Sequence, residues 1–131
     1  MNNSKYHEEV SSKWGNTSSY KEYQEKTKSY NKDKWNELTK DMNEIFSKFS
    51  ICLINNEKIG SETVFNLVKE LQNYITKNFY NCNKEMLLSL GKMYVEDERF
   101  KKNIDKDYPG TAEYIFMAIT CYYHSKQEVD Q

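Results

Sequence analysis

Hydrophobic side chains recur at steps of three and four along the first long segment of the chain, between residues 35 and 53. This spacing places them on one face of an α-helix of about six turns that begins after Asn31, a favourable N-cap. Asn55, Asn56 and Gly60 follow it as loop residues. A stripe of this length predicts a core-forming helix. Its members are Trp35, Leu38, Met42, Ile45, Phe46, Phe49, Cys52 and Leu53.

Helical spacing continues through the second half of the chain, in segments at about 62–79, 84–96, 97–106 and from 109 onward. Each segment starts at a residue suited to a helix N-terminus: Ser61, Asn83 and Asp97 as N-caps, and Pro109 in the first turn. The sequence shows neither strand alternation nor an internal repeat. We therefore expect an all-α fold, a single domain of about five or six helices around one core.

The N-terminal part of the chain has a different pattern. Residues 1–13 are polar and aperiodic, and we expect a flexible tail. Residues 14–30 have helical character, but Tyr20, Tyr23 and Tyr30 are their only large apolar surfaces after Trp14. Because ordering each residue costs about 1–2 kcal/mol, such a segment is marginal by itself. It is either an exposed helix or a mobile lid that becomes ordered when a ligand supplies apolar area.

Aromatic and sulfur-containing residues gather where the predicted helix at about 62–79 ends and the predicted helix at 84–96 begins. Phe79, Tyr80 and Cys82 precede the cap at Asn83. One face of the following helix then carries Met86, Leu87, Leu90, Met93 and Tyr94. Such a corner is either ordinary core or the wall of an apolar pocket.

Composition narrows the possible functions. The chain has 131 residues, 19 of them basic and 20 acidic, with no basic run, so we expect no direct nucleic-acid contact. The sequence shows no signal peptide and no long apolar span, which favours a cytoplasmic protein without membrane contact. Its three cysteines, Cys52, Cys82 and Cys121, are then free thiols.

Catalytic and cofactor motifs are missing from the sequence. It contains no Gly-rich phosphate loop, no Cys-x-x-Cys and no His-Glu-x-x-His. The two histidines, His7 and His124, lie near the termini, away from any central apolar helix that could present a haem ligand. We expect no enzyme, no metal site and no cofactor.

Three stretches in a fixed order resemble the TipAS antibiotic-recognition domain, the effector-binding half of MerR-like transcription regulators. The resemblance spans about residues 13–124. The first stretch is Trp14–Thr17 with Tyr20, Thr27–Tyr30 and Trp35; the second is Phe79–Cys82 with Gly91–Phe100; the third is Tyr108–Gly110 with Ala112, Tyr114, Ala118 and Ile119. The resemblance implies a globin-like helical fold and a large, mostly apolar, macrocyclic ligand, most typically a thiopeptide. It also favours the lid interpretation of residues 14–30, because this part of the domain folds on ligand binding in the family.

The resemblance further implies that the ligand is held between the Tyr-rich first helix and the aromatic corner. In relatives that capture thiopeptides covalently, a thiol adds to a dehydroamino acid, and that position is Ser89 here. A serine hydroxyl is a far weaker nucleophile without an adjacent base, so we expect reversible binding. The predicted ligand-binding residues are Tyr23, Tyr30, Trp35, Phe79, Tyr80, Cys82, Met86, Ser89, Leu90, Met93 and Tyr94.

Cys82 leaves two interpretations open. It lies just before a predicted helix N-terminus, where free N–H groups and the helix dipole can stabilise a reactive thiolate. Alternatively, it is a buried and inert thiol.

Two kinds of function remain open. Thirteen polar residues cannot hold the helix-turn-helix and coiled coil of the related regulators, so we expect either the sensor domain of a MerR-type regulator or a stand-alone drug-sequestering protein. The alternative is a helical protein-interaction module. In that case Tyr20, Tyr23 and Tyr30 would dock a partner helix or a second copy, giving a homodimer.

Overall fold

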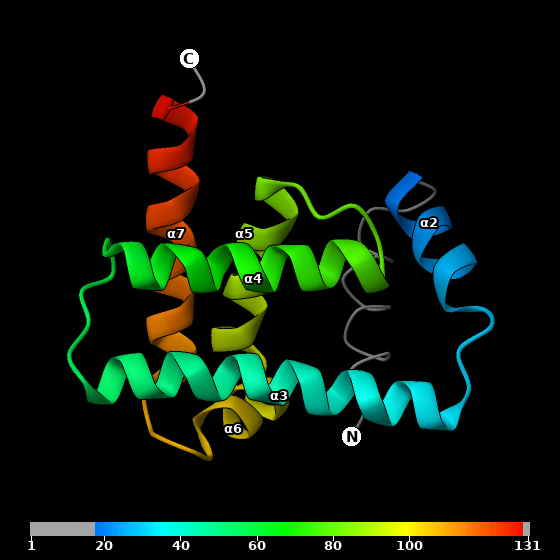
Figure 1. Cartoon of the computed structure of the whole chain (residues 1–131), viewed down its shortest axis with the longest axis horizontal. Coiled ribbons are helices and arrows are strands. Elements are labelled where there is room, and N and C mark those ends of the chain that lie inside the picture. The colour runs from blue at the N-terminus through cyan, green and yellow to red at the C-terminus, as the bar shows by residue number, and fades with distance from the viewer. Residues whose placement is uncertain (1–17, 130–131) are drawn as a thin grey trace.

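Six α-helices and no β-strand make up the part of the chain that the computed structural model describes, residues 18–129 (Figure 1). This confirms the predicted all-α class and the expected number of helices. The predicted tail at residues 1–13 lies outside the described residues. The helices are α2 (Ser18–Thr27), α3 (Lys32–Ile54), α4 (Glu62–Asn78), α5 (Lys84–Glu96), α6 (Glu98–Asp105) and α7 (Thr111–Val129).

Local sequence signals decide where most helices begin. At α3, α4, α5 and α6 a side-chain oxygen accepts a hydrogen bond from a backbone N–H of the first turn that has no intrahelical partner. These N-caps are the predicted Asn31, Ser61, Asn83 and Asp97, with donor–acceptor distances of 2.9, 3.3, 2.8 and 2.9 Å. Pro109 departs from its prediction, because α7 begins only at Thr111. The preceding turn contains Pro109 and closes at Gly110, whose φ of 93° is a conformation that glycine adopts without strain.

The helices pack in two crossed layers. In Figure 1, α3 and α4 run antiparallel beside each other, while α5 and α7 lie against each other and cross behind them. Gly91 of α5 is buried at this second contact, where an added Cβ would come within 3.0 Å of Ile119 Cδ1 and 3.1 Å of Phe116 Cδ1. The missing side chain thus lets α5 and α7 approach closely.

The core lies where the layers meet, and the long stripe of α3 supplies much of it. Six of its predicted members are buried, while Trp35 and Leu53 are partly exposed at the two ends. A buried pair of hydroxyls, Ser50 and Thr111, shares a 2.8 Å hydrogen bond that joins α3 to the start of α7. In the described residues, none of the helices combines the length and apolar character needed to cross a membrane. The buried members of the stripe are Leu38, Met42, Ile45, Phe46, Phe49 and Cys52.

Candidate ligand-binding site

The chain turns sharply between α4 and α5, and side chains of α4 hold this corner in shape. The corner comprises residues Phe79–Asn83. The backbone N–H of Cys82 donates to Thr76 Oγ1 at 3.1 Å, and the amide of Gln72 donates to the Cys82 carbonyl at 2.9 Å. Because both backbone groups of Cys82 are satisfied by α4, the corner is rigidly positioned before α5 begins.

Aromatic rings surround Phe79, which is fully buried. Its ring centroid lies 6.2 Å from that of Tyr23, 5.9 Å from that of Trp35 and 5.9 Å from that of Tyr74. Trp35 also meets Tyr30 edge to face at 5.4 Å. These distances are typical of favourable aromatic pairs, so residues from α2, α3, α4 and the corner form one cluster.

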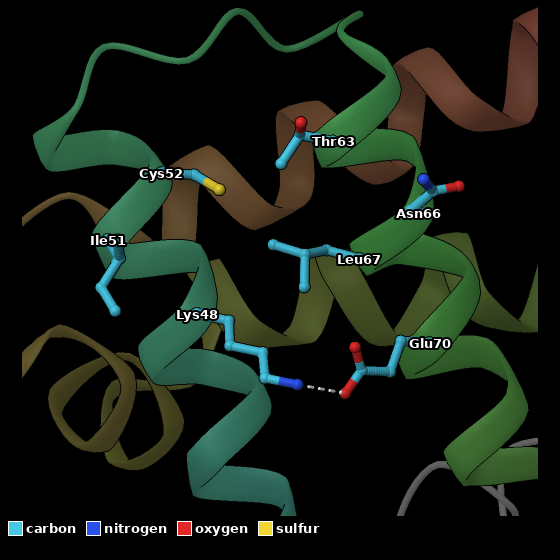
Figure 2. Close-up of a pocket in the computed structure, with 7 residues that line it drawn as sticks. All are labelled: Lys48, Ile51, Cys52, Thr63, Asn66, Leu67 and Glu70. Carbon is cyan, nitrogen blue, oxygen red and sulfur yellow. Dashed lines mark hydrogen bonds and ion pairs between the residues drawn. The ribbon is translucent and has the colours of Figure 1, made fainter.

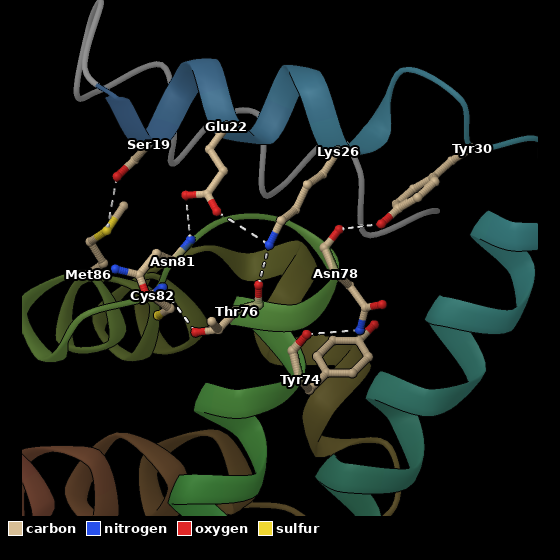
Figure 3. A network of polar contacts seen from close by, with 10 residues as sticks. All are labelled: Ser19, Glu22, Lys26, Tyr30, Tyr74, Thr76, Asn78, Asn81, Cys82 and Met86. Carbon is tan, nitrogen blue, oxygen red and sulfur yellow. Dashed lines mark hydrogen bonds and ion pairs between the residues drawn. The ribbon is translucent and has the colours of Figure 1, made fainter.

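Helix α2 lies over this corner, and polar contacts fasten it there (Figure 3). Tyr23 is the only buried residue of α2. Side chains on or just after α2 reach three backbone groups below them: Lys26 donates to the carbonyl of Thr76 at 2.6 Å, Tyr30 donates to the carbonyl of Asn78 at 2.6 Å, and Glu22 accepts from the N–H of Asn81 at 2.8 Å.

The structure brings most of the predicted ligand-binding residues together, with Ser89 as the clear exception. Ser89 is exposed on α5. The side chains of Leu90, Met93 and Tyr94 lie on the buried face of α5. Whether any of these residues contacts a ligand stays a prediction. Those that meet at the corner are Tyr23, Tyr30, Trp35, Phe79, Tyr80, Cys82 and Met86, the last of which accepts a 3.5 Å hydrogen bond from Ser19 on α2.

Tyr94 approaches the corner from the core side. Its ring packs against Phe46 at 5.4 Å and Phe100 at 5.0 Å. Its hydroxyl is buried and has no hydrogen-bond partner among the described residues. Burial, followed by the neighbouring Tyr80 hydroxyl and Cys82 thiol, raises the pKa of Tyr94 well above its ordinary value. The hydroxyl is therefore a neutral polar group held in an apolar setting.

The burial of Cys82 contradicts the reactive-thiolate interpretation and favours that of a buried thiol. Its side chain is 2% exposed, and burial raises the pKa of the thiol to about 12. The predicted helix N-terminus does lie beside it, but the loss of hydration disfavours the charged form more strongly than the helix end favours it. At neutral pH Cys82 is therefore protonated and shielded.

Two cavities lined by described residues lie away from the corner. One, of about 370 Å³, is a groove between α3 and α4 that Lys48 and Glu70 bridge at 2.9 Å (Figure 2). The other, of about 760 Å³, runs along α3 beside the loop that follows α6. Neither contains a predicted site residue, and sequence reasoning missed both because only helix packing brings their polar side chains together. Among the residues whose side chains the structure describes, 18–125, no three His, Cys, Asp or Glu side chains gather in a metal-binding arrangement.

Taken together, these observations describe a small all-helical domain in which a covering helix lies over a buried aromatic cluster. The sequence matches the TipAS antibiotic-recognition domain over residues 6–122, and the chain belongs to this family. The resemblance expected from the sequence is thereby confirmed.

Relatives and solved structures agree with this assignment. The HTH-type transcriptional activators TipA of Streptomyces coelicolor and Streptomyces lividans are each 40% identical over 114 residues, which is 87% of this chain and 45% of theirs. The chain thus spans less than half the length of these curated relatives. TipAS from the thiopeptide multidrug resistance system of S. lividans, solved with nosiheptide, superposes with a TM-score of 0.79 at 36% identity and covers 96% of this chain and 88% of that one. The antibiotic-binding domain of a TipA-class multidrug resistance transcriptional regulator superposes with a TM-score of 0.64 at 33% identity. That match covers 70% of this chain and 98% of the other.

Proposed function

We propose that this protein binds large, mostly apolar macrocyclic antibiotics, with thiopeptides as the leading class, at the aromatic corner beneath α2. Membership of the TipAS family supports the ligand class, since a relative with 36% identity is solved with nosiheptide. The observation that carries the location is the Phe79 cluster. It gathers rings from Tyr23, Trp35 and Tyr74 under a helix that buries one side chain only.

The segment at residues 14–30 acts as the lid in this proposal. Burying Tyr23 contributes a few kcal/mol at most, on the order of 1.5–3 for a large apolar side chain. Holding each residue of α2 in place opposes this with about 1–2 kcal/mol of conformational entropy. The burial of Tyr23 alone does not offset this cost, so in this proposal α2 closes through its polar contacts with the corner and is stabilised further by the apolar area of a macrocycle. We expect α2 to open, admit the ligand and close again.

Binding is non-covalent in this proposal. Cys82 is buried and protonated, and Ser89 carries a hydroxyl where capturing relatives have a thiol. After incubation with nosiheptide, mass spectrometry should detect the unmodified chain, and dialysis should remove the ligand. Ser89 is exposed on α5, outside the corner, so a Ser89→Cys variant tests whether the ligand reaches this position: an adduct there would place the ligand beyond the corner. A stable adduct on the wild-type chain would overturn the reversible mechanism.

The direct test of function is a titration with nosiheptide followed by intrinsic tryptophan fluorescence. Trp35 stacks on Phe79 with ring centroids 5.9 Å apart, so a ligand entering the cluster must change its surroundings. Trp35→Phe serves as the matched control, since it removes the tryptophan of the corner and leaves Trp14 as the other tryptophan of the chain. Saturable quenching or enhancement that is largely lost in the control supports the site. No response up to high micromolar nosiheptide, confirmed by calorimetry, would refute the proposed function.

Two physiological roles fit this activity. As the sensor domain of a MerR-type regulator, the chain would report the antibiotic to a DNA-binding region. As a stand-alone protein, it would sequester the drug by mass action. Two of the three tyrosines of the docking-module alternative, Tyr20, Tyr23 and Tyr30, are engaged within the chain: Tyr23 is buried on Phe79, and Tyr30 donates to the Asn78 carbonyl. We therefore favour the ligand-binding role.

A further inference from the structure

We propose that Glu22 and Lys26 are positioning residues: they dock α2 on the corner by matching the opposite electrical polarities of two helix ends, and they thereby slow the release of bound antibiotic. The second half of this inference rests on the proposed function, whereas the first half concerns the free protein alone.

Lys26 meets the negative end of α4. Its Nζ lies 2.6 Å from the carbonyl oxygen of Thr76, and α4 ends at Asn78. The last four carbonyls of a helix lack intrahelical partners and carry the negative end of the helix dipole. A cation donating to one of them satisfies an exposed acceptor and a favourable charge interaction at once. The neutral hydroxyl of Tyr30 donates a hydrogen bond to another of these carbonyls, that of Asn78, also at 2.6 Å.

Glu22 meets the backbone near the positive end of α5. Its Oε1 accepts a hydrogen bond from the N–H of Asn81 at 2.8 Å, two residues before the N-cap Asn83. This N–H belongs to the corner and not to α5 itself, and a carboxylate held just before a helix start is favoured by the positive end of the helix dipole. Glu22 is also 3.3 Å from Lys26, one turn further along α2.

The corner is what makes this match possible. It places the C-terminal end of α4 and the N-terminal end of α5 only a few residues apart, so that opposite polarities lie side by side (Figure 3). Helix α2 directs the Lys26 ammonium at the first end and the Glu22 carboxylate at the backbone just before the second. Since α2 buries Tyr23 alone, these polar contacts form a large part of what holds it in place.

A second ion pair, between Glu25 of α2 and Lys28 just after the helix, supplies a matched control. Lys28 and Glu25 approach to 2.7 Å, closer than the first pair, but their side chains are 66% and 73% exposed. Lys26 and Glu22 are 33% and 36% exposed and therefore less screened by solvent. If ion pairing within α2 were all that mattered, neutralising either pair would have a similar effect.

The first experiment measures amide hydrogen exchange of α2 in the free protein. Lys26→Met and Glu22→Gln should each accelerate exchange of the α2 amides about tenfold, as expected when one charge-assisted hydrogen bond is lost. Lys28→Met and Glu25→Gln should leave the rates within about twofold, the usual scale for an exposed pair. Equal effects of both sets, or no effect of the first, would overturn the proposed docking.

A charge swap separates helix-end matching from pairing within α2. The double variant Glu22→Lys with Lys26→Glu keeps an oppositely charged pair one turn apart. It now directs a carboxylate at the Thr76 carbonyl and an ammonium at the Asn81 N–H. Exchange should therefore be at least as fast as in the single variants. If the swap restores wild-type protection, pairing inside α2 explains the data and the inference is wrong.

Stopped-flow release of nosiheptide tests the second half. The dissociation rate should rise about tenfold in Lys26→Met and Glu22→Gln, with a smaller change in the association rate, because the bound complex is the state in which α2 must stay closed. Faster exchange with an unchanged dissociation rate would show that docking does not govern release. Failure of the wild-type chain to bind nosiheptide would instead refute the proposed function, and with it this second half, while the exchange results would still decide the docking.

Discussion

Truncating Phe79 is the sharpest perturbation of the aromatic corner. The ring is fully buried and contacts the rings of Tyr23, Trp35 and Tyr74, which come from three different helices. Phe79→Ala removes all of these contacts while leaving the backbone hydrogen bond from its N–H to the Ile75 carbonyl in place. The change should therefore lower global stability and, in addition, release α2.

The magnitude follows from burial and from the number of ring contacts. Replacing a fully buried phenylalanine by alanine costs about 3–5 kcal/mol in the free energy of unfolding. Each aromatic pair accounts for about 0.5–1.5 kcal/mol beyond area burial, and three such pairs place Phe79 at the upper end of the range. A loss of this size approaches the total stability of a small domain, so Phe79→Leu is the companion variant. It keeps an apolar side chain but loses the three ring pairs, so it should cost about 1.5–3 kcal/mol, less than the alanine variant.

Urea unfolding followed by circular dichroism measures the global effect, and amide exchange measures the local one. Phe46→Ala is the matched control, because Phe46 is also buried but pairs with Tyr94 in the core. Both alanine variants should lose about 3–5 kcal/mol. Only the Phe79 variants should also accelerate local exchange of α2, since α2 opens without unfolding the core.

Two results would refute this reasoning. A loss below about 1 kcal/mol for Phe79→Ala would mean that the ring does not fill a packed site. Equal acceleration of α2 exchange in the Phe46 and Phe79 variants would mean that α2 opens only with global unfolding, and that the corner does not hold it locally.

The remaining predictions concern single side chains. Tyr94→Phe should raise the free energy of unfolding by about 1 kcal/mol, because it removes a buried hydroxyl without a hydrogen-bond partner among the described residues; a loss of similar size in urea unfolding would contradict this. The Cys82 thiol, with a pKa raised to about 12 by burial, should resist iodoacetamide at pH 8 in the folded protein and react only in urea; rapid labelling of the native chain would disprove its burial. Asp97→Ala should cost about 1 kcal/mol at pH 7 by removing the cap of α6. The hydrogen bond from the Arg99 side chain lowers the pKa of the Asp97 carboxyl, so the extra stability is present above about pH 4 and should fade as the pH falls through the lower folded value; a pH-independent cost in urea melts would argue against the charged cap.

Helix positions were predictable from the sequence because their signals are local. A cap such as Asn83 acts on an N–H three residues away, and the stripe around Phe46 needs only the helical repeat to define one face. Pro109 shows the limit of this reasoning. Proline is compatible with a first helical turn. The next residue, Gly110, however, has a left-handed backbone conformation, and α7 therefore begins only at Thr111.

The candidate site was predictable as a set of residues but not as an arrangement. The sequence indicated that the residues of the corner gather near one another, and the family resemblance added Tyr23, Tyr30 and Ser89. The sequence could not indicate that Tyr23 packs on Phe79, or that Ser89 faces solvent. The hydrophobic pattern shows which face of a helix is buried, but not which other element packs against that face.

Electrostatics depended most on the tertiary structure. From the sequence, Cys82 beside a helix start was a candidate thiolate, and nothing singled out Glu22 or Lys26. In the folded chain burial raises the pKa of Cys82 to about 12, and Lys26 and Glu22 each contact a backbone group of α4 or the corner. The reason is physical: capping and periodicity depend on neighbours within one turn, whereas the energy of a charge depends on the water removed and the dipoles brought near it, and only the packed chain determines both.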